Sequence, residues 1–185
     1  MNGFRVTAIW AALWCALVNT PSTASAQSSD ELSVALSCRQ FTQQFYDWYV
    51  PFTQKHANGP AWNLALQRRA SAFSPQLFQA LKQDSEAQTK AKGEIAGIDY
   101  DPFLNTQDSA DHYEARKTTW ANGRCSVEVW HASPKDTAAK SEKPAVLAEL
   151  EQQNQRWRFL DFIYPSEDTD LLKQLQQLKK ARSER

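Results

Sequence analysis

A short acidic stretch between residues 99 and 108 carries the densest set of side chains that could do chemistry. It contains Asp99, Asp101, Asn105 and Asp108. Carboxylate and amide oxygens are the ligands that Ca²⁺ prefers, although the spacing does not fit an EF-hand loop. Paired carboxylates in a pocket can also act as general acid and base. The alternative, which we favour, is a folded loop in which these side chains hydrogen-bond nearby backbone while Phe103 enters the core.

One more carboxylate lies in the last predicted strand. Strand alternation places Asp161 on the same side as Trp157, Phe159 and Ile163. A buried aspartate has a raised pKa and can act as a base, so Asp161 is a second candidate for acid–base work. The alternative is an aspartate that a hydrogen bond satisfies, or one at the wet edge of the sheet.

Aromatic side chains gather between residues 45 and 62. The helical period assigns several of them to the core, whereas Tyr46 and Tyr49 flank that stripe. Together with Trp62, these two tyrosines are candidates for lining a cleft or an interface. The alternative is that they fill the space between a helix and a sheet.

Other common sites are missing from the sequence. The three histidines are scattered without a ligand pair, so no metal site is predicted. There is no glycine-rich phosphate loop and no G-x-S-x-G nucleophile motif. The sequence therefore predicts no cofactor and identifies no catalytic residue.

The N-terminus predicts export. Arg5 precedes an apolar run from Val6 to Val18, and Ala24-Ser25-Ala26 fits the A-x-A cleavage pattern. The run is shorter than the ~20 residues of a membrane-spanning helix. We expect residues 1–26 to be a signal peptide cleaved after Ala26, which gives a periplasmic protein. Trp14 before Cys15 argues against a lipid anchor, and no later segment is predicted to span a membrane.

Cleavage would leave two cysteines, Cys38 and Cys125. An even count in an oxidising compartment favours a disulfide between them. The alternative is a pair of buried free thiols. Cleavage would also leave a net charge of about −1, without the basic excess that nucleic-acid-binding proteins usually carry. No nucleic-acid partner is expected.

These residues must be positioned by helices that are followed by strands. Residues 27–33 are predicted as a flexible lead. Apolar residues from Val34 to Phe52 then follow a helical period, Ala61–Arg69 is a second helical stretch, and Ser74-Pro75 opens a third. Alternation and turn signals predict four strands, at 113–120, 124–132, 145–151 and 156–164, with Asn122-Gly123 as a hairpin turn.

Helices followed by strands predict an α+β fold. We expect one domain over residues 34–165, in which the N-terminal helices pack on a curved antiparallel sheet of about four strands. Residues 166–185 are expected to form a short C-terminal helix and tail. Cys38 on the helix stripe and Cys125 on an apolar strand face would then point into the same core.

Several blocks of this sequence resemble a known family. They are Phe45-Tyr46-x-Trp48-Tyr49, Phe73-Ser74-Pro75-x-Leu77, Asp99-x-Asp101-Pro102-Phe103-Leu104-Asn105-x-Gln107-Asp108, Glu142-Lys143-Pro144, Arg156-Trp157-Arg158-Phe159 and Asp161-Phe162. Over roughly residues 36–165, they resemble the bacterial envelope family catalogued as domain of unknown function 3828. The layout is also similar to the cystatin-like, nuclear-transport-factor-2-like superfold, which hosts both enzymes and binding modules. The family lends no catalytic residue.

Three functions remain open. The first is a periplasmic, non-enzymatic module that binds a protein or a small ligand in a cleft between the first helix and the sheet. The second is a small-molecule hydrolase or isomerase that uses Asp99, Asp101 or Asp161 as a pocket carboxylate. The third is a toxin-neutralising (immunity) or envelope-stress protein.

Overall fold

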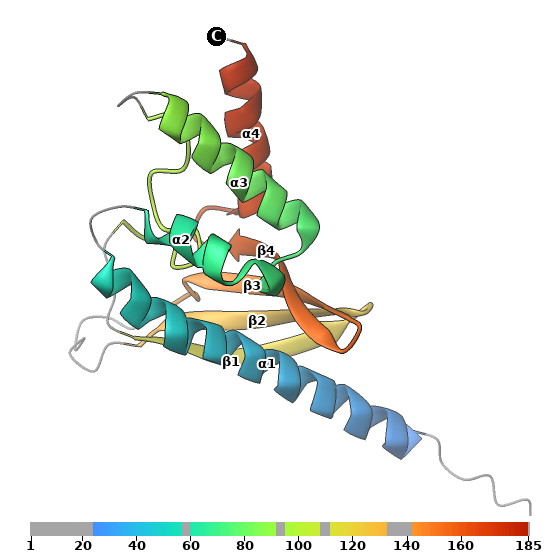
Figure 1. Ribbon diagram of the computed structural model, residues 1–185. Helices are drawn as coiled ribbons and strands as arrows, with labels where there is room; N and C mark the ends of the chain where they lie inside the picture. Colours follow the sequence, from blue (N-terminus) through green and yellow to red (C-terminus); the bar gives the residue numbers. More distant parts are fainter. Residues whose placement is uncertain (1–23, 57–59, 92–94, 108–111, 133–141, 185) are drawn as a thin grey trace, which may run out of the picture.

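The computed structural model describes residues 24–56, 60–91, 95–107, 112–132 and 142–184, with side chains from residue 29 onward. In these ranges the chain folds into α-helices and one five-stranded antiparallel sheet (Figure 1). The helical part precedes the sheet in the sequence, and a C-terminal helix follows it. The predicted α+β class is confirmed.

The first helix, α1 (Ala24–Lys55), lies across the sheet, and its N-terminal turns extend past the sheet edge (Figure 1). Residues 27–33, which the sequence predicts as a flexible lead, are helical in the structure. No glycine or proline stands between Ala24 and Val50, so no residue in this stretch ends the helix early.

The next helices are short or capped. They are α2 (Ala61–Arg68), the 3₁₀ turn η1 (Ala70–Ala72) and α3 (Pro75–Lys90). The Ser74 hydroxyl accepts a hydrogen bond from the Leu77 N–H at 3.2 Å, which confirms the predicted cap. The C-terminal helix α4 (Leu171–Ser183) is capped in the same way by Asp170 and packs beside α3 (Figure 1).

The strands are β1 (Tyr113–Ala121), β2 (Arg124–His131), β3 (Val146–Gln153), β4 (Arg156–Tyr164) and β5 (Thr169–Asp170). They lie in the sheet in the order of the sequence. The predicted hairpin turn is confirmed, because Asn122 and Gly123 both have a positive φ. The sequence did not predict β5, a two-residue strand that pairs with the end of β4.

Gln43 of α1 ties the helix to the edge strand. Its Nε2 donates to the Tyr113 carbonyl at 3.1 Å, and its Oε1 accepts from the Ala115 N–H at 2.7 Å. The β1–β2 register shifts just after Ala115, where a bulge leaves backbone groups in need of partners. Below this contact, Phe45 packs against Phe103 and Phe159, which joins the helix, a loop and the sheet in one core.

Candidate functional site

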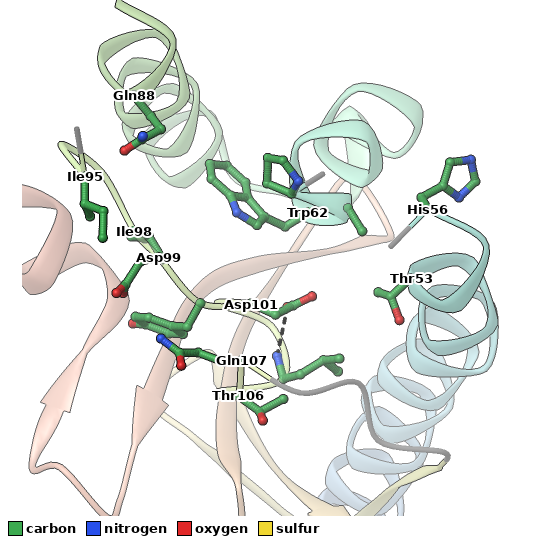
Figure 2. A pocket seen from close by; sticks show the side chains of 14 residues that line it. Thr53, His56, Trp62, Gln88, Ile95, Ile98, Asp99, Asp101, Thr106 and Gln107 are labelled. Atoms are coloured by element: carbon green, nitrogen blue, oxygen red, sulfur yellow. Dashed lines mark hydrogen bonds between the residues drawn. The ribbon is translucent and has the colours of Figure 1, made fainter. Parts of the chain in front are cut away.

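The residues that end α1 and begin α2 border a pocket of about 490 Å³ (Figure 2). Its other walls come from α3 and from the loop of residues 95–107. We call it the α1–α2 pocket. It is lined by Thr53, His56, Pro60, Ala61, Trp62, Gln88, Ile95, Ile98, Asp99, Tyr100, Asp101, Leu104, Thr106 and Gln107. Its volume lies in the range of small-ligand sites.

Four tyrosine hydroxyls hold the floor of this pocket in place. They come from α1, β1 and β4, and they donate to consecutive residues of the loop. The pairs are Tyr49 to the Asp101 carboxylate at 2.5 Å, Tyr164 to the Pro102 carbonyl at 2.9 Å, Tyr46 to the Phe103 carbonyl at 2.7 Å and Tyr113 to the Leu104 carbonyl at 3.3 Å. Because each donor belongs to a regular element, the loop is fixed to the scaffold at every one of these positions.

Asp101 organises the loop from within. Its Oδ1 accepts from the Phe103 and Leu104 N–H groups at 3.0 and 3.2 Å, and its backbone N–H donates to the Thr106 carbonyl at 2.8 Å. Burial raises the pKa of Asp101 from its ordinary 3.8 to about 6, although the hydrogen bonds from Tyr49, Phe103 and Leu104 lower it. The carboxylate is therefore both a structural acceptor and a perturbed group in a pocket wall.

The upper wall, residues 95–98, is held by α3 and α4. The Gln88 side-chain oxygen accepts from the Ala96 and Gly97 N–H groups, each at 2.8 Å. The carboxylate of Asp84, which is only 1% exposed, accepts from the Ile98 N–H at 2.8 Å and pairs with Arg182 at 2.6 Å. A Cβ on Gly97 would lie 2.6 Å from that carboxylate, so glycine is required at this close approach.

The remaining lining residues differ in their direction. Figure 2 shows Asp101 between Trp62 of α2 and Thr53 of α1, whereas the Asp99 carboxylate points away from Trp62. The His56 ring also points away from Asp101; its Nδ1 lies 2.8 Å from the Phe52 carbonyl. The pocket thus has one carboxylate among its central groups and a second, exposed one at its rim.

The structure places the other predicted site residues elsewhere. Tyr46 and Tyr49 are 1% and 0% exposed, so they belong to the core and do not line a cleft between α1 and the sheet. Asn105 has a positive φ in the loop turn, and its side chain reaches the Ala145 carbonyl at 3.5 Å. Asp108 lies outside the described residues. The α1–α2 pocket is lined by the end of the first helix, α2, α3 and the 95–107 loop, and not by the sheet.

Asp161 does not join this pocket. A register shift between Glu149 and Leu150 puts a β-bulge in the β3–β4 pair, so Asp161 lies opposite Glu149 on the face that Phe159 does not share. The predicted alternation is corrected at this point. The Asp161 Oδ1 accepts from the Phe162 N–H at 2.8 Å and from the Leu172 N–H at 3.1 Å, at the start of α4. Burial, with Asp170 nearby, raises the pKa of Asp161 to about 7.

The acidic stretch matches the folded-loop interpretation. Phe103 is fully buried, and the Asp101 carboxylate bonds backbone two and three residues ahead. Within the described ranges, no group of three or more His, Cys, Asp or Glu side chains is placed to hold a metal ion. Of the acid–base candidates, Asp101 lies among the central groups of the pocket, Asp99 lines its exposed rim, and Asp161 does not line it.

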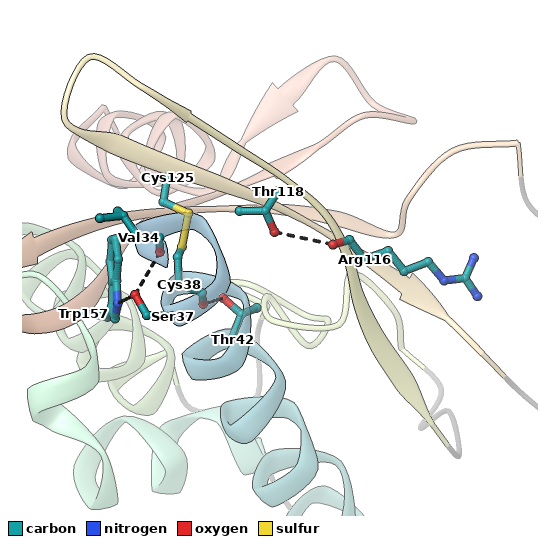
Figure 3. The surroundings of a disulfide bond; sticks show 8 residues. All are labelled: Val34, Ser37, Cys38, Thr42, Arg116, Thr118, Cys125 and Trp157. Atoms are coloured by element: carbon teal, nitrogen blue, oxygen red, sulfur yellow. Dashed lines mark hydrogen bonds between the residues drawn. A yellow bond between two sulfur atoms is a disulfide. The ribbon is translucent and has the colours of Figure 1, made fainter. Parts of the chain in front are cut away.

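The two cysteines form the predicted disulfide. Cys38 of α1 and Cys125 of β2 are bonded, with their Cα atoms 6.6 Å apart (Figure 3). Next to the bridge, the Trp157 indole N–H donates to the Ser37 hydroxyl at 3.1 Å. The bridge fixes α1 on the sheet, at the half of the helix remote from the α1–α2 pocket.

Several pocket residues gave no signal in the sequence. Thr53, Gln88 and Ile98 come from three separate segments, and none of them belongs to a motif. Only the Asp-Pro-Phe block and Trp62 pointed to this region. Gly97 is a signal that could have pointed to it, since a lone glycine beside apolar residues can mark a close backbone approach.

Comparisons with protein-family models, curated proteins and solved structures find no match for this chain. Among the described residues, no helix combines the length and the apolar character that crossing a membrane requires.

Proposed function

We propose that this protein is an exported periplasmic module that binds a small organic ligand in the α1–α2 pocket. The observation that carries the proposal is the pocket itself, a cavity of about 490 Å³ with walls from α1, α2, α3 and the 95–107 loop. Ligand sites are usually concave, largely formed before binding and furnished with a few polar groups. Thr53, Gln88 and Asp101 are such groups here.

The fixed loop supports this proposal. Tyrosine hydroxyls bond four consecutive loop residues, and Asp84 and Gln88 bond the backbone of the upper wall. A site that is already ordered spends little free energy on ordering when a ligand arrives. The many hydrogen bonds on this loop therefore favour binding over a purely spacer role.

Export is part of the proposal, and the disulfide supports it because such bridges persist in oxidising compartments. The test is the intact mass of the protein from a periplasmic extract. The measured mass should correspond to a chain that starts at Gln27. Before reduction, it should be lower than after reduction by the mass of two hydrogen atoms. A full-length chain in the cytoplasmic fraction would contradict export.

The fold and family relationships remain proposals. A long helix across an antiparallel sheet supports the cystatin-like, nuclear-transport-factor-2-like superfold, and the bonded Asp-Pro-Phe block supports the envelope family of domain of unknown function 3828. That superfold carries binding modules as well as enzymes, so it does not choose between the functions.

The binding test uses a variant that fills the pocket. Ala61 lines the pocket at the start of α2, so Ala61→Leu adds apolar volume to the site. Ala35→Leu makes the same change in the part of α1 remote from the pocket and is the matched control. Both variants are screened by thermal shift against a broad library of small organic compounds.

We expect compounds that stabilise the wild type and Ala35→Leu, and that lose this effect with Ala61→Leu. Stabilisation follows from mass action, because a ligand that binds only the folded state raises its stability. If every active compound shifts all three proteins equally, the α1–α2 pocket is not the binding site.

A second candidate function is a hydrolase or isomerase with Asp101 as its base. The raised pKa of Asp101 in a pocket wall favours it. Against it, both carboxylate oxygens already accept hydrogen bonds inside the protein. The binding function and the enzyme function are distinguished by NMR, which shows over time whether a ligand of the pocket is chemically converted. Conversion by the wild type that is lost in Asp101→Asn would replace the binding proposal.

A further inference from the structure

The charged side chains that line the α1–α2 pocket are acidic. Among its described lining residues, the ionisable side chains are Asp99, Asp101, His56 and the tyrosine Tyr100, without a lysine or arginine. A ligand that enters this pocket therefore meets carboxylates and no fixed cation of the described chain. An anionic ligand would be repelled, and a positively charged one would be attracted.

Asp101 in particular has no counter-cation among the described residues. Its hydrogen bonds come from the neutral Tyr49 hydroxyl and from two backbone N–H groups, and it forms no ion pair with a described side chain. The fully buried carboxylate of Asp84 is treated differently, because it is paired with Arg182 at 2.6 Å. Buried charges are normally paired.

Asp101 still has room for one more donor. A carboxylate offers about four acceptor positions. Three of them are used by Tyr49, Phe103 and Leu104. The fourth position is on Oδ2 of Asp101. Asp101 lines the pocket and lies between Trp62 and Thr53 (Figure 2).

Part of the pocket lining is apolar. Trp62, Ile98 and Leu104 contribute to it, and Ile95, which also lines the pocket, is 70% exposed. A large apolar residue this exposed gains free energy when an apolar group covers it. The pocket therefore matches a ligand with one charged end and one apolar end.

We infer that the ligand of the α1–α2 pocket is a small organic cation, a protonated amine on an apolar body, whose N–H groups donate to Asp101 while its apolar part lies against Trp62 and Ile95. The inference rests on the proposed function and specifies the chemical class of its ligand. The amine supplies the positive charge that no described residue gives to Asp101.

The experiment compares three probes with one skeleton and different charge. They are 2-phenylethylamine, 2-phenylethanol and 3-phenylpropionate, titrated into the disulfide-bonded mature wild-type protein by isothermal calorimetry and ligand-observed NMR. We expect the amine to bind about tenfold more tightly than the alcohol, since a charge-assisted hydrogen bond is roughly twice as strong as a neutral one. The carboxylate should not bind.

Variants locate the charge that the amine recognises. Asp101→Asn keeps a side-chain acceptor for the loop but removes the charge, so it should reduce amine binding to the level of the alcohol. Asp30→Asn removes an exposed carboxylate at the far end of α1 and should leave binding unchanged. Near-UV circular dichroism checks that Asp101→Asn keeps the wild-type packing, and the probe comparison on the wild type needs no variant.

The pH dependence gives an independent readout. From about pH 7.5 to about pH 5, amine binding should weaken about tenfold as Asp101 takes up a proton. The groups that face Asp101 are Tyr46 and Tyr49 of α1 and Tyr113 of β1, which stay protonated, and Asp99 and His56 also line the pocket. His56→Gln removes the histidine from the pocket lining and should retain the weakening.

The outcomes separate the inference from the proposed function. If the alcohol or the carboxylate binds as tightly as the amine, the inference of a cationic ligand is wrong, but the proposal that the pocket binds a ligand is retained. If none of the three probes binds, the inference is overturned, and the library screen with Ala61→Leu still decides whether the pocket binds another ligand.

Discussion

Asp101 links the stability of the loop to the chemistry of the pocket. Its pKa in the folded protein is about 6, above its ordinary 3.8, because burial penalises the charged form. The folded state therefore holds the Asp101 proton more tightly than the unfolded state does. The sign follows: this residue favours folding most below about pH 4, and that contribution is lost as the pH rises through 6.

Asp101→Asn should reveal this titration. Between about pH 4 and pH 7, the wild type should lose roughly 2 kcal/mol of unfolding free energy relative to the variant, measured by urea unfolding at each pH. The hydrogen bonds that asparagine cannot make add an offset that does not change with pH. Asp161 is present in both proteins, so its contribution to the pH dependence cancels when the two profiles are compared. Parallel pH profiles would show that Asp101 is not perturbed in the folded protein.

The tyrosine hydroxyls should differ in their energetic value. Tyr46→Phe leaves the buried Phe103 carbonyl without its donor and should cost about 1–2 kcal/mol in urea unfolding. Tyr100→Phe is the matched control, because its partner Gln174 lies at a partly exposed site where water can replace the hydroxyl. An equal loss in both variants would contradict the role assigned to the buried bond.

These tyrosines also show why residue roles were hard to predict. The helical period put Tyr46 and Tyr49 beside the core stripe, whereas both are buried in the core, and their hydroxyl partners lie 57 and 52 residues away in the chain. Periodicity reports the face of a helix and is silent on which distant loop reaches it. For this reason two core residues resembled members of a cleft.

Helix starts and tight turns were predicted from the sequence because they depend on residues next to one another in the chain. Ser74-Pro75 predicted the start of α3, and Asn122-Gly123 predicted the β1–β2 turn. The bulge that moves Asp161 off the Phe159 face could not be predicted, because it depends on the register with β3. Strict alternation fails at such positions.

The contact between α3 and α4 should be sensitive at Arg182. Arg182→Ala would leave Asp84 buried without its charge partner and should cost about 3 kcal/mol of unfolding free energy. Arg182 also donates to the Ala96 carbonyl, so amide hydrogen exchange in residues 96–98 should accelerate.

Lys180→Ala is the control for this prediction. Lys180 lies on the same helix and pairs with Glu184 at 3.9 Å in an exposed position. It should cost less than about 0.5 kcal/mol and leave the exchange of residues 96–98 unchanged. If the two variants behave alike, the Asp84–Arg182 pair does not hold the pocket wall.

For the molecule as a whole, the disulfide should be the strongest single contributor to stability. It closes a loop with a sequence separation of 87, for which chain entropy gives about 4.6 kcal/mol. The double variant Cys38→Ser/Cys125→Ser should lose about this amount in urea unfolding, and reduced wild type should match it. An unchanged free energy of unfolding would mean that the disulfide makes no net contribution to stability.

The architecture followed from the sequence more fully than the site did. Helical and strand periods, together with two cysteines on apolar faces, were enough to predict a helix bonded to a sheet. The α1–α2 pocket combines Thr53, Trp62, Gln88 and Asp101 from four separate segments. No short-range pattern relates such residues, so the pocket became visible only in three dimensions.

The order of the strands has a kinetic consequence. Each strand pairs with its neighbour in the sequence, so the sheet can assemble from hairpins whose loops are cheap to close. The contact of α1 with β2 spans far more of the chain and should form late. In an exported chain that crosses the membrane N-terminus first, Cys38 would reach the oxidising side and remain unpaired until Cys125 followed. Oxidation would then complete folding. If residues 1–26 are cleaved with Cys15, two cysteines remain, and a disulfide mispaired within one chain could not arise.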